Sequence, residues 1–392
     1  MYVNIAVLKE TESHEKRVAL VPSVAPKLIK LGVKLHMQTG AGDGSSMPGE
    51  MYKEVEFIAK RGKLVADADV VLAVQPPPLA VVEAMKEGSV LISFIYAEHE
   101  PALVKKLLEK KITCFAMERI PRISRAQSMD ALSSQAALAG YYAVGLGATH
   151  LARILPKITS AAGVVGPATV LVMGLGVAGL EAVAMAQRLG AVVEGYDVRP
   201  ATAEQVASLG GTFVDTGVDA TGKGGYARAL TDEEKTKVNA VLTKHIQTAD
   251  LIITTAAIPG KASPKLISKA QVAGMKAGSV IVDLSAEGGG NCEDSQPGAT
   301  IRVGGVTIVA PLNVPSSLGQ DASELYSKNI YNFLALILKD NVLKIDWTDE
   351  VIQGTALTHA GKLIKSPEKP EKADSKSGLK TSATVTPPVK AA

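Results

Sequence analysis

The chain has 392 residues, of which 46% are apolar and 21% charged, a mixture typical of soluble globular proteins with about two domains. Its formal net charge of +3 is too small for a nucleic-acid-binding surface, so we expect no nucleic-acid partner. Its two cysteines, Cys114 and Cys292, exclude a disulfide framework and lack metal-ligand spacing. We therefore expect a reducing compartment and no bound metal.

Short apolar strands and amphipathic helices alternate through the first 120 residues. The chain begins with a strand-like run and shows no signal peptide. The expected elements are strand Asn4–Leu8, helix Pro22–Leu31, strand Val33–Gln38, strand Val70–Val74, helix Leu79–Glu87, strand Val90–Phe94, helix Pro101–Lys110 and strand Ile112–Met117. This alternation predicts a mostly parallel sheet with helices on both faces.

The same pattern returns between residues 168 and 309. The expected strands are Ala168–Met173, Ala191–Tyr196, Thr212–Val214, Asp250–Thr254, Ser279–Leu284 and Val306–Val309. Long helices at Ser128–Leu155 and Leu318–Lys339 are expected to join the two halves. The fold predicted is therefore α/β, with two Rossmann-like, doubly wound parallel-sheet domains joined by long helices.

The second long helix would return the chain to the first half. We therefore expect a discontinuous first domain, residues 1–130 plus 320–365, and an inserted nucleotide-binding domain, residues 131–319, with a ligand cleft between them. Residues 366–392 contain four prolines and almost no large apolar residues, which predicts a disordered tail. The tail is either a frayed terminus or a tether to a partner.

One uncharged stretch, Ile158–Leu180, is long enough to span a membrane. It contains Pro167 and ends in a glycine-rich turn. Buried strands of parallel sheets also give unbroken apolar runs, so we expect a strand and not a transmembrane helix.

The turn after the strand at 168–173 carries a dinucleotide-binding pattern, GLGVAG, at residues 174–179. Gly174 permits the tight turn, Gly176 lets the backbone approach a pyrophosphate, and Gly179 lets the helix pack on the strand. Val177 and Ala178 start the helix, where backbone N–H groups face the phosphates. A strand before the pattern and a helix after it make a chance match improbable.

Asp197 stands at the end of the next strand, where an acid accepts hydrogen bonds from the adenosine ribose. A carboxylate there repels a 2′-phosphate and favours NAD over NADP. Val198 and Arg199 follow it, and an arginine nearby is able to accept a 2′-phosphate. Because the acid dominates, we expect Arg199 to lie against the adenine.

Three later segments are expected near the cofactor. The glycine-rich stretch between Asp215 and Thr231 is either a mobile lid with Tyr226 as its contact or a surface loop. Thr255 and Ala256 follow a strand that passes beneath the nicotinamide half. Asp283 or Glu287, after the next strand, either reaches the ligand or serves turn chemistry.

Before the first long helix, Gln127, Asp130 and Ser133 are spaced by three residues and share a face, with Arg122 just upstream. Ser128 is a candidate helix cap. An amide, a carboxylate and a hydroxyl at a helix start suit a carboxamide. The alternative is capping beside a solvated charge run.

These residues resemble a known family, the NAD(H)-binding component (domain I, alpha subunit) of proton-translocating NAD(P) transhydrogenase, over about residues 1–365. The most specific match is RISRAQSMDALSSQA at 122–136. Related alanine dehydrogenases share the other matches, which are VMGLGVAGLEA at 172–182, YDVRP at 196–200, TTAAIPGKASPKLI at 254–267 and VDLSAEGGGNCE at 282–293.

The resemblance implies catalytic roles for Arg122, Gln127, Asp130 and Ser133 around the nicotinamide, with Gln127 aligning two nicotinamide rings. It implies NAD(H) as a bound substrate, hydride transfer to NADP⁺ on a partner, and coupling to proton movement across a membrane. It also implies a homodimer that docks on a membrane-spanning component and an NADP(H)-binding component. Those components would be separate chains here, and the subunit would lie peripherally on the cytoplasmic side of the inner membrane.

Two alternatives remain open. An alanine dehydrogenase acting alone would share Arg17 as a carboxylate ligand, but its substrate lysine falls at Gln75 and its catalytic histidine near Tyr96. His99 is close by but reads as a solvated loop histidine. A third possibility is an NAD-sensing regulator without chemistry.

Overall fold

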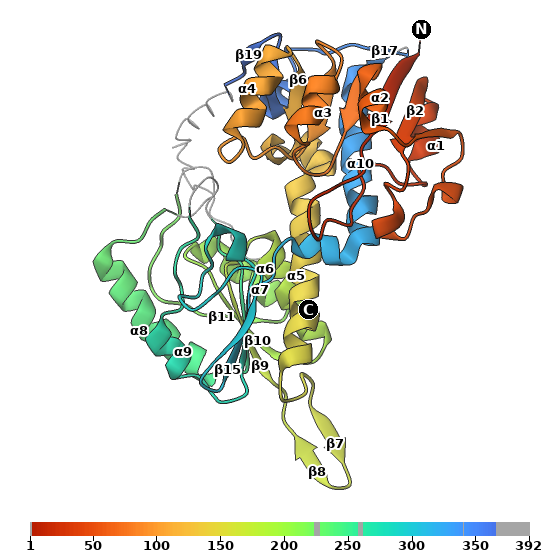
Figure 1. Ribbon diagram of the computed structural model, residues 1–392. Coiled ribbons are helices and arrows are strands. Elements are labelled where there is room, and N and C mark those ends of the chain that lie inside the picture. Colours follow the sequence, from red (N-terminus) through yellow and green to blue (C-terminus); the bar gives the residue numbers. More distant parts are fainter. Residues whose placement is uncertain (1, 223–227, 258–261, 340, 366–392) are drawn as a thin grey trace, which may run out of the picture.

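The computed structural model describes residues 2–222, 228–257, 262–339 and 341–365, which form two lobes, each built on one sheet (Figure 1). The predicted tail, 366–392, and the predicted lid residue Tyr226 lie outside these ranges. The α/β class with two doubly wound sheets, predicted from alternating strands and helices, is confirmed.

The first lobe contains an eight-stranded sheet. Its strands are β1 (Val3–Val7), β2 (Val33–Gln38), β3 (Val55–Ile58), β4 (Val70–Leu72), β5 (Val90–Ser93), β6 (Thr113–Ala116), β18 (Ala356–His359) and β19 (Lys362–Leu363). The order β19-β18-β6-β5-β4-β1-β2-β3 is doubly wound, with the switch between β1 and β4. β1 to β6 are parallel, whereas β18 and β19 are antiparallel additions from the end of the chain.

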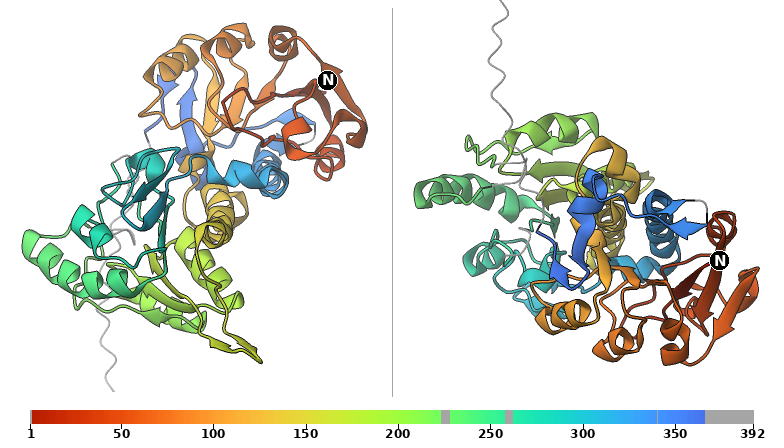
Figure 2. Two further views of the ribbon diagram at one scale, coloured as in Figure 1. Left: turned by 60° about the horizontal axis from the view of Figure 1, so that its bottom comes forward. Right: turned by 90° about the horizontal axis from the view of Figure 1, so that it is seen from above.

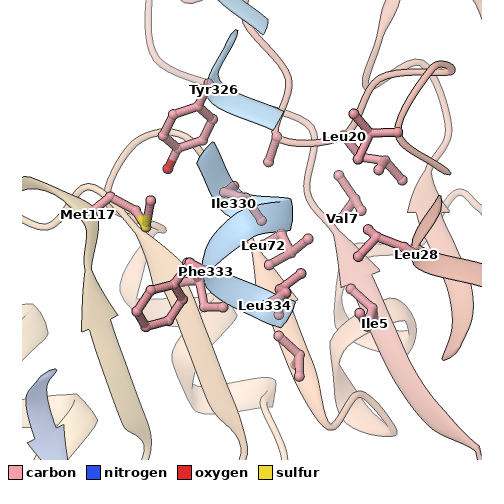
Figure 3. Packing of buried hydrophobic residues seen from close by; sticks show 14 of the residues in the cluster. Ile5, Val7, Leu20, Leu28, Leu72, Met117, Tyr326, Ile330, Phe333 and Leu334 are labelled. Carbon is pink, nitrogen blue, oxygen red and sulfur yellow. The ribbon is translucent and has the colours of Figure 1, made fainter. Parts of the chain in front are cut away.

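Helices cover both faces of this sheet (Figure 1). They are α1 (Ala25–Ile29), α2 (Arg61–Ala66), α3 (Leu79–Ala84), α4 (Pro101–Glu109), α10 (Gly319–Ile337) and α11 (Glu350–Thr355). Tyr326, Ile330 and Phe333 of α10 are fully buried or nearly so and pack toward Leu72 and Met117 (Figure 3). The helix therefore ties the last third of the chain into the first lobe.

The second lobe contains a seven-stranded sheet in the order β11-β10-β9-β12-β13-β15-β14. Its strands are β9 (Thr169–Met173), β10 (Val192–Tyr196), β11 (Thr212–Phe213), β12 (Leu251–Thr254), β13 (Val280–Asp283), β14 (Thr300–Val303) and β15 (Val306–Val309). Only β14 is antiparallel, and the switch lies between β9 and β12. Its helices are α6 (Val177–Arg188), α7 (Ala203–Ser208), α8 (Asp232–Thr248) and α9 (Lys269–Ala273).

Short elements connect these regions. The 3-10 helices are η1 (Asp43–Ser45), η2 (Gly49–Met51), η3 (Met117–Arg119), η4 (Ser124–Met129), η5 (Pro200–Thr202), η7 (Ala286–Gly288) and η8 (Val314–Leu318). A two-stranded pair, β16 (Leu338–Lys339) and β17 (Val342–Leu343), follows α10.

The helix α5 (Ala131–His150) runs from the first lobe into the second (Figures 1 and 2). It is shorter than the predicted 128–155, because Asp130 and not Ser128 is its N-cap. A β-carbon at Gly140 would lie 2.1 Å from the carbonyl oxygen of Ala178. α5 therefore passes directly against the first turn of α6.

The uncharged stretch contains two structures. β7 (Ile158–Ser160) and β8 (Gly163–Val165) form a hairpin that projects from the second lobe, and β9 is a buried strand (Figure 1). All six hairpin strand residues are exposed, so the prediction of a buried strand holds only for β9. Within the described residues, no helix has the length and apolar character needed to cross a membrane.

Candidate active site

The glycine-rich turn joins β9 to α6, with Gly176 as the N-cap. Gly174 has a φ of +95°, which a side chain would strain. A β-carbon on Gly179 would stand 1.8 Å from the carbonyl oxygen of Gly174, whereas one on Gly176 would meet no atom within 4 Å. The first glycine makes the turn and the third permits the packing of helix on strand. The second leaves an open approach to the backbone.

Val177 and Ala178 form the first turn of α6, whose N–H groups lack partners inside the helix. Val177 keeps 43% of its surface exposed, and Ala178 is half-buried. The N-terminus of α6 therefore offers amide donors and a positive dipole end to a phosphate.

The end of β12 meets this turn at the switch point of the sheet. The hydroxyl of Thr255 donates a hydrogen bond of 2.8 Å to the carbonyl oxygen of Gly174. The N–H of Ala256 donates to Oδ1 of Asn291 at 3.0 Å. The structure thus brings the predicted residues Thr255 and Ala256 beside the glycine-rich turn.

Asp283, at the end of β13, is fully buried and does not face the cleft. Its carboxylate accepts hydrogen bonds from the backbone N–H groups of Asn291 and Cys292, at 2.7 and 3.0 Å, and from the hydroxyl of Ser295 at 2.6 Å. Of the two interpretations offered for Asp283, turn chemistry is correct.

Asn291 is a residue that sequence reasoning missed. Its side-chain amide donates to the carbonyl oxygens of Ala256 and Pro264, both at 2.8 Å. It therefore holds the loop after β12 against the loop after β13. An Asn directly after three glycines was the available signal, since that position suits a turn.

Asp197 ends β10 and is nearly buried, as expected, but its carboxylate is already engaged. Oδ2 accepts from the N–H of Leu175 in the glycine-rich turn at 2.8 Å. Arg199 folds back onto the same carboxylate, with Nε at 2.8 Å from Oδ1 and a terminal nitrogen at 2.7 Å from Oδ2. Val198 lies between them, half-buried. The guanidinium of Arg199 therefore lies on Asp197, where we expected it against the adenine.

In the first lobe, Arg122, Gln127, Asp130 and Ser133 line one cavity of about 350 Å³ together with Pro121 and Ile123. Asp130 accepts from the N–H and the hydroxyl of Ser133, at 2.9 and 2.6 Å. The four residues predicted from their spacing are therefore brought together. Asp130 also caps α5, so the capping interpretation is correct as well.

The η4 segment that carries Gln127 is held from two sides. Arg125 pairs with Asp349, the N-cap of α11, through a 3.0 Å bond among others. Asn329 and Asn332 of α10 donate to the carbonyl oxygen of Ser128, at 2.9 and 3.0 Å. Gln127 itself is exposed, but its backbone is fixed by partners about 200 residues away in sequence.

Glu287 belongs to a second cavity, of about 380 Å³, and not to the one around Gln127. Its carboxylate accepts from the N–H of Asn313 at 2.7 Å. Among the described residues that line this cavity, the ionisable ones are Arg17, Tyr96 and Glu287, with no histidine or lysine. His99 is exposed and does not line it.

Arg17 is buried and already has partners in this second cavity. It pairs with Glu15 at 2.6 Å and donates to Gln135 at 2.9 Å. Burial alone would raise the pKa of Glu15, but the hydrogen bonds from Arg17 lower it to about 2, so the pair stays ionised. Glu10, whose pKa burial raises to about 7, is bonded to the N–H of Val74 and does not line the cavity.

A phosphate-accepting turn at the switch point of a doubly wound sheet defines a dinucleotide-binding α/β protein. Comparison with known proteins is more specific. Residues 6–139 match the family described as alanine dehydrogenase/PNT, N-terminal domain, and residues 143–366 match its C-terminal domain.

The first of the separate chains of NAD(P) transhydrogenase subunit alpha from Rhodospirillum rubrum is 45% identical over 377 residues, covering 92% of this chain and 98% of that protein. A solved transhydrogenase structure from Sinorhizobium meliloti aligns with a TM-score of 0.84 at 40% identity, covering 92% of this chain and all of that one. An alanine dehydrogenase of Methanococcus maripaludis is 30% identical over 329 residues, covering 81% and 83%. The chain belongs to the alanine dehydrogenase/PNT family and, within it, to the NAD(P) transhydrogenase alpha subunits.

Proposed function

We propose that this chain binds NADH and presents it for hydride transfer to NADP⁺ held on a separate component, in a complex that couples the transfer to proton movement across a membrane. The observation that carries this proposal is the cluster of Arg122, Gln127, Asp130 and Ser133 in one cavity. Together they offer a guanidinium, an amide, a carboxylate and a hydroxyl, which suit a carboxamide and a phosphate.

The cluster lies within reach of the glycine-rich turn. Ser133 and Gly140 are both on α5, seven residues apart, which is roughly 10 Å along a helix axis. Gly140 touches the start of α6, where the phosphates of a dinucleotide are expected. A dinucleotide held at that turn, with its ribose toward Asp197 and its other half passing Thr255 and Ala256, is thus directed toward the cluster.

The chemistry agrees with this arrangement. Nicotinamide supplies the hydride, and transfer between two such rings requires them close, aligned and shielded from water, with no proton donor. A dehydrogenase that reduces a carbonyl needs such a donor beside it. The second cavity offers Gln75 and Tyr96 where alanine dehydrogenases are expected to carry a lysine and a histidine, which disfavours the dehydrogenase alternative.

Mixing the purified chain with the NADP(H)-binding component of a transhydrogenase tests the proposal. We expect hydride exchange between NADH and NADP⁺ that depends on both components, and no NADH formation from alanine and NAD⁺. Robust pyruvate formation from alanine would contradict the proposal in favour of the dehydrogenase. NADH binding without exchange, with an active partner, would favour a regulator.

The family relationship implies partners, and we infer a homodimer that docks on a membrane-spanning component at the cytoplasmic face of the inner membrane. The hairpin β7–β8 supports self-association. Ile158, Val164 and Val165 are 46%, 61% and 50% exposed on it. A lone two-stranded hairpin is marginally stable in water, so this projecting arm fits best as one that packs on a second copy (Figure 2).

A Val165→Asp variant should weaken this dimer at least about tenfold, because a carboxylate would be buried in an apolar contact. Analytical ultracentrifugation over a concentration series measures the shift. Val342→Asp is the matched control, since Val342 is also 50% exposed but lies on β17 in the other lobe. Equal dimer strength in the two variants would exclude the hairpin from the interface.

We also propose that residues 1–130 with 320–365 and residues 131–319 are the two domains, with α5 and the start of α10 as linkers. The entry of β18 and β19 into the first sheet supports this division. We infer that the tail 366–392 is disordered, as its composition predicts.

A further inference from the structure

The carboxylate of Asp197 has no acceptor position left for a ribose. A carboxylate offers about four lone-pair positions. Here Oδ1 accepts from the backbone N–H and from Nε of Arg199, at 2.9 and 2.8 Å. Oδ2 accepts from the N–H of Leu175 and from a terminal nitrogen of Arg199, at 2.8 and 2.7 Å.

Two of these four bonds are replaceable. The bonds from the N–H groups of Leu175 and Arg199 belong to the backbone of the turn and of the residues after β10. The two bonds from the guanidinium belong to a side chain that retains 24% exposure, against 7% for Asp197. A ribose that approaches Asp197 therefore competes with the Arg199 side chain and not with the turn.

We propose that the Asp197–Arg199 pair is a selectivity switch for the dinucleotide: the ribose hydroxyls of NADH displace Arg199 from Asp197, and Asp197 withholds Arg199 from the 2′-phosphate of NADP(H). This inference rests on the proposed NADH site and adds to it which side chain decides between the two dinucleotides. An arginine is the side chain best shaped to hold a phosphate in two bonds.

The switch has consequences of opposite sign for the two residues. Arg199 costs NADH affinity, since its bonds to Asp197 must be broken before the ribose binds. Asp197 costs NADPH affinity twice, because its charge repels the phosphate and its carboxylate holds the group that would attract it. An arginine that lies against the adenine would instead favour both dinucleotides.

Three variants test the proposal: Arg199→Gln, Asp197→Asn and the double variant. Asparagine is preferred at 197, because its side-chain oxygen still accepts from the N–H of Leu175 and preserves the turn. Binding of NADH and of NADPH is measured by isothermal titration calorimetry, with the melting temperature of each variant recorded beside it.

We expect Arg199→Gln to tighten NADH binding at least about threefold, the loss of a competing pair, and to leave NADPH weak. We expect Asp197→Asn to weaken NADH and to tighten NADPH at least about tenfold, with this gain lost in the double variant. Weaker NADH binding by a folded Arg199→Gln variant would overturn the proposal, as would an Asp197→Asn variant that gains nothing for NADPH. If the unaltered chain binds neither dinucleotide, the proposed function itself is wrong, which is a different outcome.

Discussion

Replacing Gly179 with alanine is expected to abolish NADH binding and to destabilise the second lobe. The added β-carbon would lie 1.8 Å from the carbonyl oxygen of Gly174 and 3.2 Å from the hydroxyl of Thr255. The first contact is with backbone at the core of the fold, so either β9 or α6 must move. Overpacking of this kind lowers the free energy of unfolding by about 1–3 kcal/mol, and here we expect the upper end of that range.

The same displacement moves the N-terminus of α6 away from the phosphates. We expect at least a roughly hundredfold loss of NADH affinity, which is about 2.7 kcal/mol. Thermal unfolding and calorimetric titration measure the two effects.

Gly176→Ala is the matched control, because its β-carbon meets no protein atom within 4 Å. Its φ of −80° is ordinary for alanine, so the free energy of unfolding should change by less than about 1 kcal/mol. A pyrophosphate on the turn would meet the new methyl group, and NADH binding should still fall. If Gly176→Ala binds NADH normally, the pyrophosphate does not cross this turn.

The elements that local sequence could predict are those with strong local signals. Val33–Gln38 and β15 are predicted to the residue, because apolar runs between turn residues define them. β3 was missed because none of its four residues is buried, so its apolar pattern is weak. β18 and β19 were missed because they join β6 from about 240 residues away, which no local pattern encodes.

The candidate site divides in the same way. The spacing of Gln127, Asp130 and Ser133 places them on one cavity, and the sequence suffices for that. The bonds from Asn329 and Asn332 to Ser128 depend on how α10 packs after some 200 residues of intervening chain. The pairing of Arg199 with Asp197 is local in sequence, but an arginine two residues from an acid has several rotamers open to it. Only the packed turn shows which one is adopted.

Gln127→Asn is expected to slow hydride exchange roughly a hundredfold while NADH binding changes less than about threefold, because misplacement by about 1 Å costs that much in an aligned reaction. The argument depends on how rigidly Gln127 is presented. Arg125 ties its segment to Asp349, and α10 holds the carbonyl of Ser128. The shorter side chain therefore cannot regain its reach by a backbone shift.

The exchange rate with the NADP(H)-binding component and the dissociation constant for NADH are measured on the same preparations. Gln320→Asn, at an exposed glutamine near the start of α10, is the control and should leave both quantities unchanged. A parallel loss of binding and rate in Gln127→Asn would mean that Gln127 only grips NADH. A selective loss of rate is what separates alignment of two rings from simple affinity. The cavity geometry supports alignment because Asp130 and Ser133 are already bonded to each other, which leaves Gln127 as the uncharged hydrogen-bonding side chain at the rim.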